Sequence, residues 1–248
     1  MQLVGDQALV TLTADACRHD PMADPAASLA MIDRVLTREV DLAGLDGSDP
    51  VHAPTPLCQH FIVDLRASAA DRQLFYKYAA DGFIGMRPDN SGDLTDPGRL
   101  AQEWAIWHEV GPIRQPYSWT WGSLTEINVN VWSLHVQEAL GRESRLAATD
   151  EGKSIRAQAR DYIGQAGGPP DYRLDDDDTV FIRLVMVEQL ARVCGWDLFR
   201  ALNRVTRLSP LPRSGHRSGQ GRSCRPDDLP ADRPRPAAVL WPLVVVGQ

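Results

Sequence analysis

Two of the four Asp-Pro pairs in this chain limit the folds open to it, because each of these two predicts the start of a helix. An aspartate side chain can cap the first free amides of a helix, and proline fits the first turn, where no amide partner is needed. After Asp24-Pro25, apolar residues recur at helical spacing as far as Gly44, and the same pattern follows Asp96-Pro97. The chain therefore has at least two predicted helices with defined starting points.

Strand-like and further helical segments complete the predicted fold. Runs rich in Val, Ile, Leu, Phe and Thr at residues 8–13 and 60–65 predict a small N-terminal sheet. Helical spacing predicts further helices over residues 126–140, 179–193 and 197–208, with Gly141 and Gly195 as breakers. The predicted fold class is α+β and predominantly helical.

Composition narrows the classes of partner. The chain has 248 residues, of which 43% are hydrophobic and 24% charged, as in ordinary soluble domains. A formal net charge of -7 argues against nucleic acid and anionic membranes as partners. The longest apolar run, residues 239–246, contains Pro242 and is too short to cross a bilayer. Four scattered cysteines predict neither a disulfide framework nor a zinc ribbon.

The two ends of the chain differ from the rest. Residues 209–248 hold seven of the 18 prolines, together with many Arg, Gly and Ser residues. We therefore expect a folded domain over residues 1–208 and an irregular tail over 209–248. Permitted codons from Leu211 onward, read one nucleotide later, can encode a helix-like sequence, so we interpret the tail as a candidate frame-shifted segment. The N-terminus has no basic start and no apolar run, which predicts no signal peptide.

The stretch WHEVGPIRQPYSWTWGSLTEINVNVWSL contains most of a zinc peptidase site. Two histidines four residues apart lie on one helix face and can bind one ion, and the glutamate after the first histidine faces the metal-bound water. A third ligand from a later helix leaves one position open for that water. His108, Glu109 and Glu126 match three of these four roles, and Pro112 stands at the position of the second histidine.

This stretch resembles the enhancin-like zinc metallopeptidases, whose pattern is HExGHxxQ, then Trp residues, then a TE-V-N-type segment. The matching positions are His108, Glu109, Gly111, Gln115, Trp119, Trp121, Glu126 and Asn130. The resemblance continues through residues 181–207 and covers much of residues 25–208. It implies a thermolysin-like peptidase catalytic domain, here truncated at its N-terminus.

The resemblance also implies roles for individual residues. His108 and Glu126 would be zinc ligands, and Glu109 would be the general base. The implied activity is zinc-dependent hydrolysis of peptide bonds in proteins or glycoproteins such as mucins. Family members act outside the cell or at its surface, whereas this chain, if complete, would be cytoplasmic because it lacks a signal peptide.

Proline at position 112 changes this expectation. It offers no ligand atom, so zinc would keep two protein ligands. Inside a helix it also removes an amide donor and crowds the carbonyl of His108, at roughly 3 kcal/mol. We therefore predict that His108 is displaced and that zinc binding and peptidase activity are impaired in this chain.

Two other interpretations stay open. The chain could be a non-catalytic module that keeps the cleft for binding glycoprotein or peptide, with Trp119 and Trp121 in contact with the ligand. It could also be an unrelated helical domain, which a separation above about 10 Å between His108 and Glu126 would favour. We expect His135 to be a packed or exposed helix histidine and the acidic run at residues 175–178 to be a helix start rather than a calcium loop.

Overall fold

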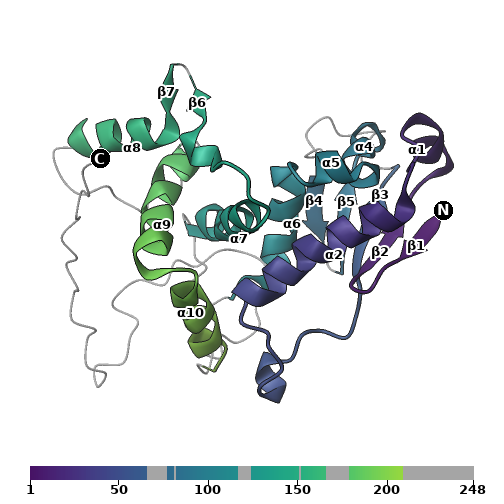
Figure 1. The fold of residues 1–248 in the computed structure, drawn as a ribbon, viewed down its shortest axis with the longest axis horizontal. Coiled ribbons are helices and arrows are strands. Elements are labelled where there is room, and N and C mark those ends of the chain that lie inside the picture. The colour runs from purple at the N-terminus through teal and green to yellow at the C-terminus, as the bar shows by residue number, and fades with distance from the viewer. Residues whose placement is uncertain (66–76, 81, 117–123, 151, 166–178, 209–248) are drawn as a thin grey trace, which may run out of the picture. The chain divides into compact units, whose positions relative to one another are not determined.

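A five-stranded mixed sheet forms one side of the protein (Figure 1). The computed structural model describes residues 1–65, 77–80, 82–116, 124–150, 152–165 and 179–208. The strands are β1 (Gln2–Val4), β2 (Ala8–Thr11), β3 (Gln59–Val63), β4 (Lys77–Ala80) and β5 (Phe83–Met86), in the spatial order β1-β2-β3-β5-β4. The pairs β2–β3 and β3–β5 are parallel, and the two outer pairs are antiparallel. Strand β4 therefore forms an edge of the sheet.

The predicted strands at residues 8–13 and 60–65 correspond to β2 and β3, which are interior strands of the sheet. The prediction did not include β1, β4 or β5. Each has three or four residues, which is too short for a reliable alternating pattern. The small N-terminal sheet is thus confirmed, and its size and order come from the structure.

Helix α2 (Pro25–Leu42) follows α1 (Ala14–His19) and packs against the sheet and the central helices. Its predicted start is confirmed, because the Asp24 side chain accepts a hydrogen bond from the amide of Ala27 at 2.9 Å. Just after its end, Gly44 has a φ of 65°, a left-handed conformation that favours glycine. Local sequence signals alone therefore set both ends of this helix.

The helix predicted after Asp96-Pro97 is instead two helices, α5 (Pro97–Leu100) and α6 (Trp104–Arg114), preceded by α4 (Gly92–Thr95). The carbonyl of Leu100 accepts a hydrogen bond from Trp107 Nε1 at 3.1 Å, and the Glu103 side chain caps α6 by accepting from the amide of Ala105. These contacts satisfy the groups that a break exposes. Helical spacing continues across residues 101–103, so the sequence pattern did not reveal the break.

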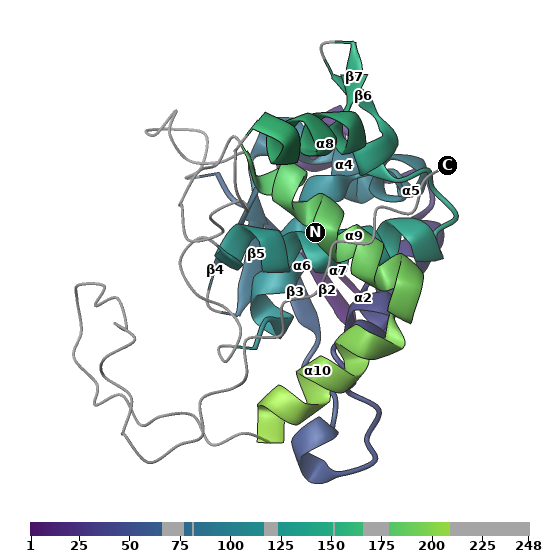
Figure 2. The same cartoon turned by 90° about the vertical axis from the view of Figure 1, so that its left-hand side faces the viewer.

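The C-terminal half is helical. It contains α7 (Thr125–Ala139), α8 (Ile155–Gln165), α9 (Val180–Cys194) and α10 (Asp197–Leu208), with the short hairpin β6 (Thr149–Asp150) and β7 (Lys153–Ser154). The 3-10 turns are η1 (Pro50–His52), η2 (Pro88–Asn90) and η5 (Arg145–Ala147). Figures 1 and 2 show that α9 contacts α8 and leads directly into α10. The predicted helices α7, α9 and α10 are confirmed to within one or two residues, and α8 was not predicted.

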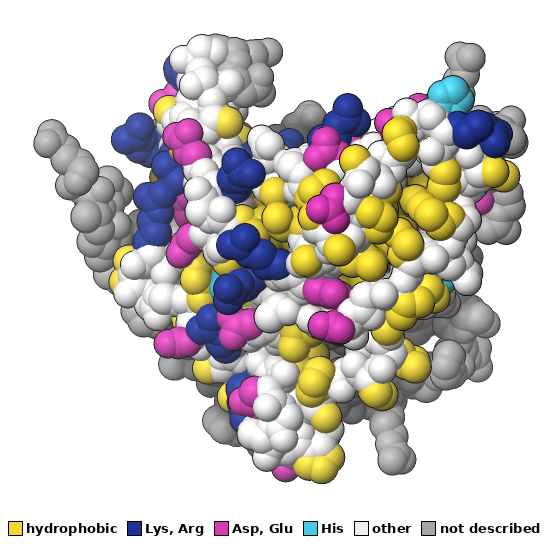
Figure 3. All heavy atoms as spheres, turned by 45° about the vertical axis from the view of Figure 1, so that its right-hand side comes forward, with side chains coloured by type: hydrophobic (Ala, Val, Ile, Leu, Met, Phe, Trp, Pro, Cys, Tyr) yellow, Lys and Arg dark blue, Asp and Glu magenta, His cyan; other side chains and the backbone are white. Residues whose placement is uncertain are grey.

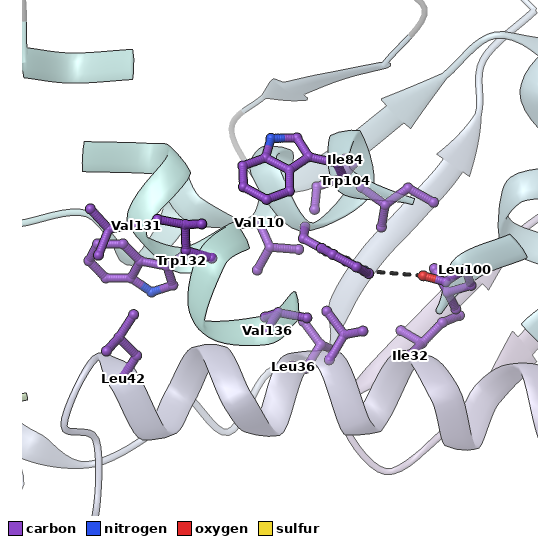
Figure 4. Packing of buried hydrophobic residues seen from close by; sticks show 14 of the residues in the cluster. Ile32, Leu36, Leu42, Ile84, Leu100, Trp104, Val110, Val131, Trp132 and Val136 are labelled. Atoms are coloured by element: carbon purple, nitrogen blue, oxygen red, sulfur yellow. Dashed lines mark hydrogen bonds between the residues drawn. The ribbon is translucent and has the colours of Figure 1, made fainter. Parts of the chain in front are cut away.

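The main core lies where α2, α6, α7 and the sheet meet (Figure 4). Trp107 from α6 and Trp132 from α7 are almost completely buried, and in Figure 4 Leu42 at the end of α2 lies just below Trp132. Burying a large apolar side chain contributes about 1.5–3 kcal/mol. The packing of α6 and α7 on this core holds their outer faces in fixed positions.

Helix α10 contacts the end of α2 through polar groups. Arg200 forms an ion pair with Asp41 at 2.7 Å, and the Asn203 side chain donates a hydrogen bond to the carbonyl of Leu42 at 2.9 Å. On the face shown in Figure 3, basic and acidic side chains lie next to one another beside a broad hydrophobic area. Within the described part of the chain, no helix has the length and apolar character needed to cross a membrane.

Candidate active site

Helix α6 carries His108 and Glu109, the adjacent pair selected from the sequence. Successive helical residues differ by about 100° in direction, so the two side chains have different neighbours. His108 faces helix α7, whereas the Glu109 carboxylate lies near the backbone of Ala79 on the edge strand β4. Helix α6 thus presents one acid–base side chain toward α7 and another toward the sheet edge.

The close approach of α6 and α7 depends on Gly111. A Cβ atom at this position would lie 2.9 Å from Val129 Cγ1, closer than real Cβ atoms come, and 3.2 Å from the Val129 carbonyl oxygen, which is a tight contact. The Gln115 side chain then donates to the carbonyl of Thr125 at 2.9 Å, which joins the end of α6 to the start of α7. Both residues belong to the pattern matched in the sequence, and both keep the two helices together.

His108 and Glu126 meet across this helix pair. His108 Nε2 lies 3.3 Å from Glu126 Oε2, so the prediction that the imidazole and this carboxylate converge is met. The other ring nitrogen, His108 Nδ1, lies 3.0 Å from Asn130 Oδ1. Asn130 Oδ1 also accepts from Trp104 Nε1 at 2.9 Å, and Asn130 Nδ2 donates to the carbonyl of Glu126 at 2.8 Å.

These contacts determine which nitrogen of His108 faces the cleft. Two partners orient the Asn130 amide, so its Oδ1 points at His108 and can only accept. Nδ1 of His108 must therefore donate the hydrogen bond, which leaves Nε2 on the side of Glu126. A hydrogen bond of this kind to the second ring nitrogen is how proteins orient metal-binding histidines.

The three ionisable groups shift one another's pKa values. Burial acts to lower the pKa of His108, but hydrogen bonds with Glu126 and Asn130 and the charge of Glu109 outweigh it, so this pKa is raised. Burial raises the pKa of Glu109. The hydrogen bond with His108 lowers the pKa of Glu126. The pair His108–Glu126 therefore stabilises the charged state of both members, whereas burial acts against the charged form of Glu109.

A cleft of about 750 Å³ opens along these side chains. Strand β4 and helices α6, α7 and α9 line it, and its described lining includes Tyr78, His108, Glu109, Pro112 and Glu126. This volume lies within the range of ligand-binding clefts, about 300–1,000 Å³. The cleft places a carboxylate, an imidazole and a second carboxylate in one accessible space, as a hydrolytic site requires.

Residues 1–220 match the family model of peptidase M60, enhancin and enhancin-like. The chain belongs to this family. No curated protein matches it.

Solved structures share the M60 fold. A functionally unknown conserved protein from Bacillus anthracis str. Ames has 28% identity and a TM-score of 0.70 over 84% of this chain and 41% of its own. A metallopeptidase in complex with Tn antigen has 18% identity and a TM-score of 0.64 over 84% of this chain and 38% of its own. The M60 catalytic domain of Clostridium perfringens ZmpC, in complex with the sialyl T antigen, has 18% identity and a TM-score of 0.60 over 84% of this chain and 39% of its own.

These similarities confirm the predicted fold class, an α+β domain of the M60 catalytic type that is mostly helical. The third interpretation, an unrelated helical domain, is wrong because the family model matches most of the chain. The chain spans less than half the length of each of these structures. Similarity over this part of their length does not by itself assign the activity or substrates of a whole M60 protein to this chain.

Membership of the M60 metallopeptidases implies a metal, typically zinc, and the residues present can be tested against it. His108 and Glu126 lie close enough to share one ion, but Pro112 replaces the third donor with a ring that has no lone pair to offer. In the described residues no group of three or more His, Cys, Asp or Glu side chains could hold a metal. The described residues therefore do not complete the three-ligand set of a catalytic zinc.

Pro112 affects the helix less than the sequence indicated. Helix α6 continues past Pro112 to Arg114, and the amide of Gln115 donates to the carbonyl of Gly111 at 2.9 Å. Pro112 lies near the helix end, where few hydrogen bonds remain to be lost. The Asn130 contact and the packing of α6 hold the His108 ring toward Glu126.

The other predicted residues have varied positions. Trp119 and Trp121 lie outside the described residues, as do the acidic run at 175–178 and the tail from 209. His135 is buried on α7, with its ring 4.8 Å from that of Trp196, and is not part of the cleft lining. His60 lies on β3 and contacts Thr11 Oγ1 at 2.8 Å.

Among the cleft residues that had no sequence signal are Lys77, Ala79 and Arg145. Lys77 and Ala79 come from the short edge strand, and Ala79 contributes through its backbone, which any residue supplies. Arg145 lies in the short turn η5 after α7. A neighbour of Glu109 on a strand far away in the sequence can be found only once the sheet is placed beside α6.

Proposed function

We propose that this chain is an M60 peptidase unit whose cleft binds protein or glycoprotein segments such as those of mucins, and that Pro112 impairs its zinc-dependent cleavage. The observation that carries this proposal is the approach of His108 Nε2 to Glu126 Oε2, at 3.3 Å, in a cleft that Pro112 also lines. Two structurally similar proteins are complexes with the Tn and sialyl T antigens, which supports a glycan-bearing substrate.

The chain's own groups have separable roles under this proposal. Glu109 lies in the same cleft as the ligand pair and is the candidate general base. Its carboxylate lies near the backbone of Ala79 on β4, and Asn130 holds the imidazole of His108 toward Glu126. A bound zinc ion would supply Lewis-acid polarisation of the scissile carbonyl. What is missing is a metal-binding side chain at position 112, where this chain has proline.

Replacing Pro112→His tests the assignment. We expect this variant to take up zinc in equilibrium dialysis with metal analysis and to gain cleavage of casein or mucin, because a third donor completes the ligand set. Pro112→Ala is the matched control, since it removes proline without adding an imidazole, and it should gain neither property. Adding Glu109→Gln to Pro112→His should keep zinc uptake and lose cleavage.

The outcome that contradicts the assignment is equally direct. If Pro112→His folds, as judged by circular dichroism, and shows neither zinc uptake nor cleavage, His108 and Glu126 are not the remaining ligands. If Pro112→Ala alone is active, the impairment arises from the helix rather than from the missing donor.

A second candidate function is a non-catalytic module that binds glycoprotein or peptide. The incomplete ligand set beside an open cleft of about 750 Å³ favours it. We expect such a module to bind mucin in the presence of a chelator and to lose that binding in Trp119→Ala or Trp121→Ala, measured by a pull-down on immobilised mucin. The absence of any mucin binding by the unaltered chain would remove this candidate.

A further inference from the structure

One wall of the cleft combines two aromatic rings with a cation. Trp104 comes from α6, Phe181 from α9 and Arg145 from the turn η5 between α7 and β6. The ring centroids of Trp104 and Phe181 are 6.1 Å apart. Arg145 Cζ lies over both rings, 5.3 Å from the Trp104 centroid and 4.5 Å from the Phe181 centroid. Three separate elements thus hold one guanidinium at the cleft.

The basic side chains Lys77 and Arg145 of the cleft lining differ in their exposure. The Lys77 side chain is 1% exposed and forms ion pairs with Asp93 at 2.8 Å and Glu103 at 3.2 Å, so its charge is compensated beneath the surface. Arg145 is an exposed residue, and cation–π contact engages the face of a guanidinium while its N–H donors lie along the edges of the plane. Among the described lining residues, Arg145 is the exposed basic side chain with a permanent charge.

The aromatic wall is directly connected to the candidate zinc ligands. Trp104 Nε1 donates to Asn130 Oδ1 at 2.9 Å, and the same oxygen accepts from His108 Nδ1 at 3.0 Å. A ligand lying along the cleft can therefore contact Arg145 while another part of it reaches His108. The negative side chain Glu126 belongs to the His108 part of the cleft and the positive side chain Arg145 to the aromatic wall.

We propose that Arg145 is a specificity-determining residue that binds a carboxylate of the substrate against the Trp104–Phe181 wall. This inference rests on the proposed function, since it concerns what the same cleft selects. Because stacking on two rings already restricts the arginine side chain, less conformational entropy is lost when it binds a ligand. A guanidinium can pair with a carboxylate through two parallel hydrogen bonds. The carboxylate belongs either to an acidic amino acid of the peptide or to an acidic sugar attached to it.

Paired peptides test the selection on the full chain. A series of labelled Thr- and Pro-rich peptides carries one Glu at successive positions, and a matching series carries Gln. By fluorescence polarisation, we expect the Glu peptide of one register to bind about tenfold more tightly than its Gln partner. Arg145→Gln should remove this preference, and Arg145→Lys should keep part of it, because a lysine keeps the charge without the planar fork.

Arg142→Gln is the matched control. Arg142 is exposed, lies three residues before Arg145 and lines a separate cavity near α7, α8 and α9. The substitution Arg142→Gln removes one positive charge from the same loop and should leave the preference for Glu peptides unchanged. Competition experiments then separate the two sources of the carboxylate. A site for an acidic sugar is inhibited by free glucuronate but not by galactose, and it shows no preference for Glu peptides. A site for an acidic amino acid shows the Glu preference.

Every outcome decides the inference. Equal binding of Glu and Gln peptides, without selective competition by glucuronate, overturns it while leaving the proposed cleft intact. Retention of the carboxylate preference in Arg145→Gln also overturns it. Failure of the unaltered chain to bind any peptide, acidic sugar or mucin overturns the proposed function, and the role of Arg145 fails with it.

Discussion

Two histidines of this chain lie equally close to a carboxylate in two different regions. In the cleft, His108 Nε2 is 3.3 Å from Glu126 Oε2, and between α7 and α2, His135 Nε2 is 3.3 Å from Asp41 Oδ2. Burial acts to lower both pKa values. The pKa of His108 is nevertheless raised, whereas the pKa of His135 falls to about 4.

The difference comes from the other charges around each ring. Asp41 already forms an ion pair with Arg200 at 2.7 Å, and both Arg200 and Arg38 act to lower the pKa of His135. His108 has acidic neighbours instead, since Glu109 and Glu126 both act to raise its pKa. The distance to one carboxylate therefore does not decide the charge of a histidine; burial and the summed charge of all neighbours do.

Truncating the two histidines should give the largest contrast. We expect His135→Ala to lower the free energy of unfolding by about 2 to 3 kcal/mol, because it leaves a cavity beside Trp196. His108→Ala, in the open cleft, should lower it by less than about 1 kcal/mol. Urea denaturation followed by circular dichroism measures both. Equal losses would show that the cleft and the packed region are held equally tightly.

The pH dependence of stability should differ in sign between the two residues. The folded pKa of His135, about 4, lies below its unfolded value near 6.5, so its neutral form is favoured and stability is lost as pH falls from about 6.5 toward 4. This contributes a loss of about 2 kcal/mol at pH 5. His108, with a raised pKa, contributes stability that is present below about 6.5 and is lost as pH rises through its folded pKa.

Variants isolate each contribution. His135→Phe keeps the packed ring and should flatten the acid side of the stability profile, whereas His108→Asn should flatten the side above pH 6.5. An acid slope that persists in His135→Phe would contradict the neutral, buried state of this residue.

The smallest expected effect concerns the partner of the cleft histidine. Glu126→Gln removes the charge but keeps the size of the side chain, and the pKa of His108 should fall because its hydrogen bond and ion pair with this residue weaken. Stability should change by less than about 1 kcal/mol, since Glu126 is half exposed. Histidine signals followed by NMR during a pH titration measure the shift, and an unchanged His108 would show that Glu109 and Asn130 alone raise its pKa.

Much of this site could be anticipated from local sequence. The resemblance around His108, Glu109 and Glu126 implied that these groups share one site, and in the structure all three line the same cleft. The helix limits at Asp24-Pro25 and Gly44 were equally local. Such features depend on residues within a few positions of one another, which is why their pattern survives in a sequence read alone.

The remaining features depend on segments far apart in the chain, and only the tertiary structure decided them. The backbone of Ala79 beside Glu109, the guanidinium of Arg145 over Phe181 and the opposite pKa shifts of His108 and His135 all come from neighbours on other elements. The sequence by itself determined which groups are present, their helical spacing and the proline at the third ligand position. Burial and the sum of distant charges, which no short pattern encodes, determined the environment and protonation of each group.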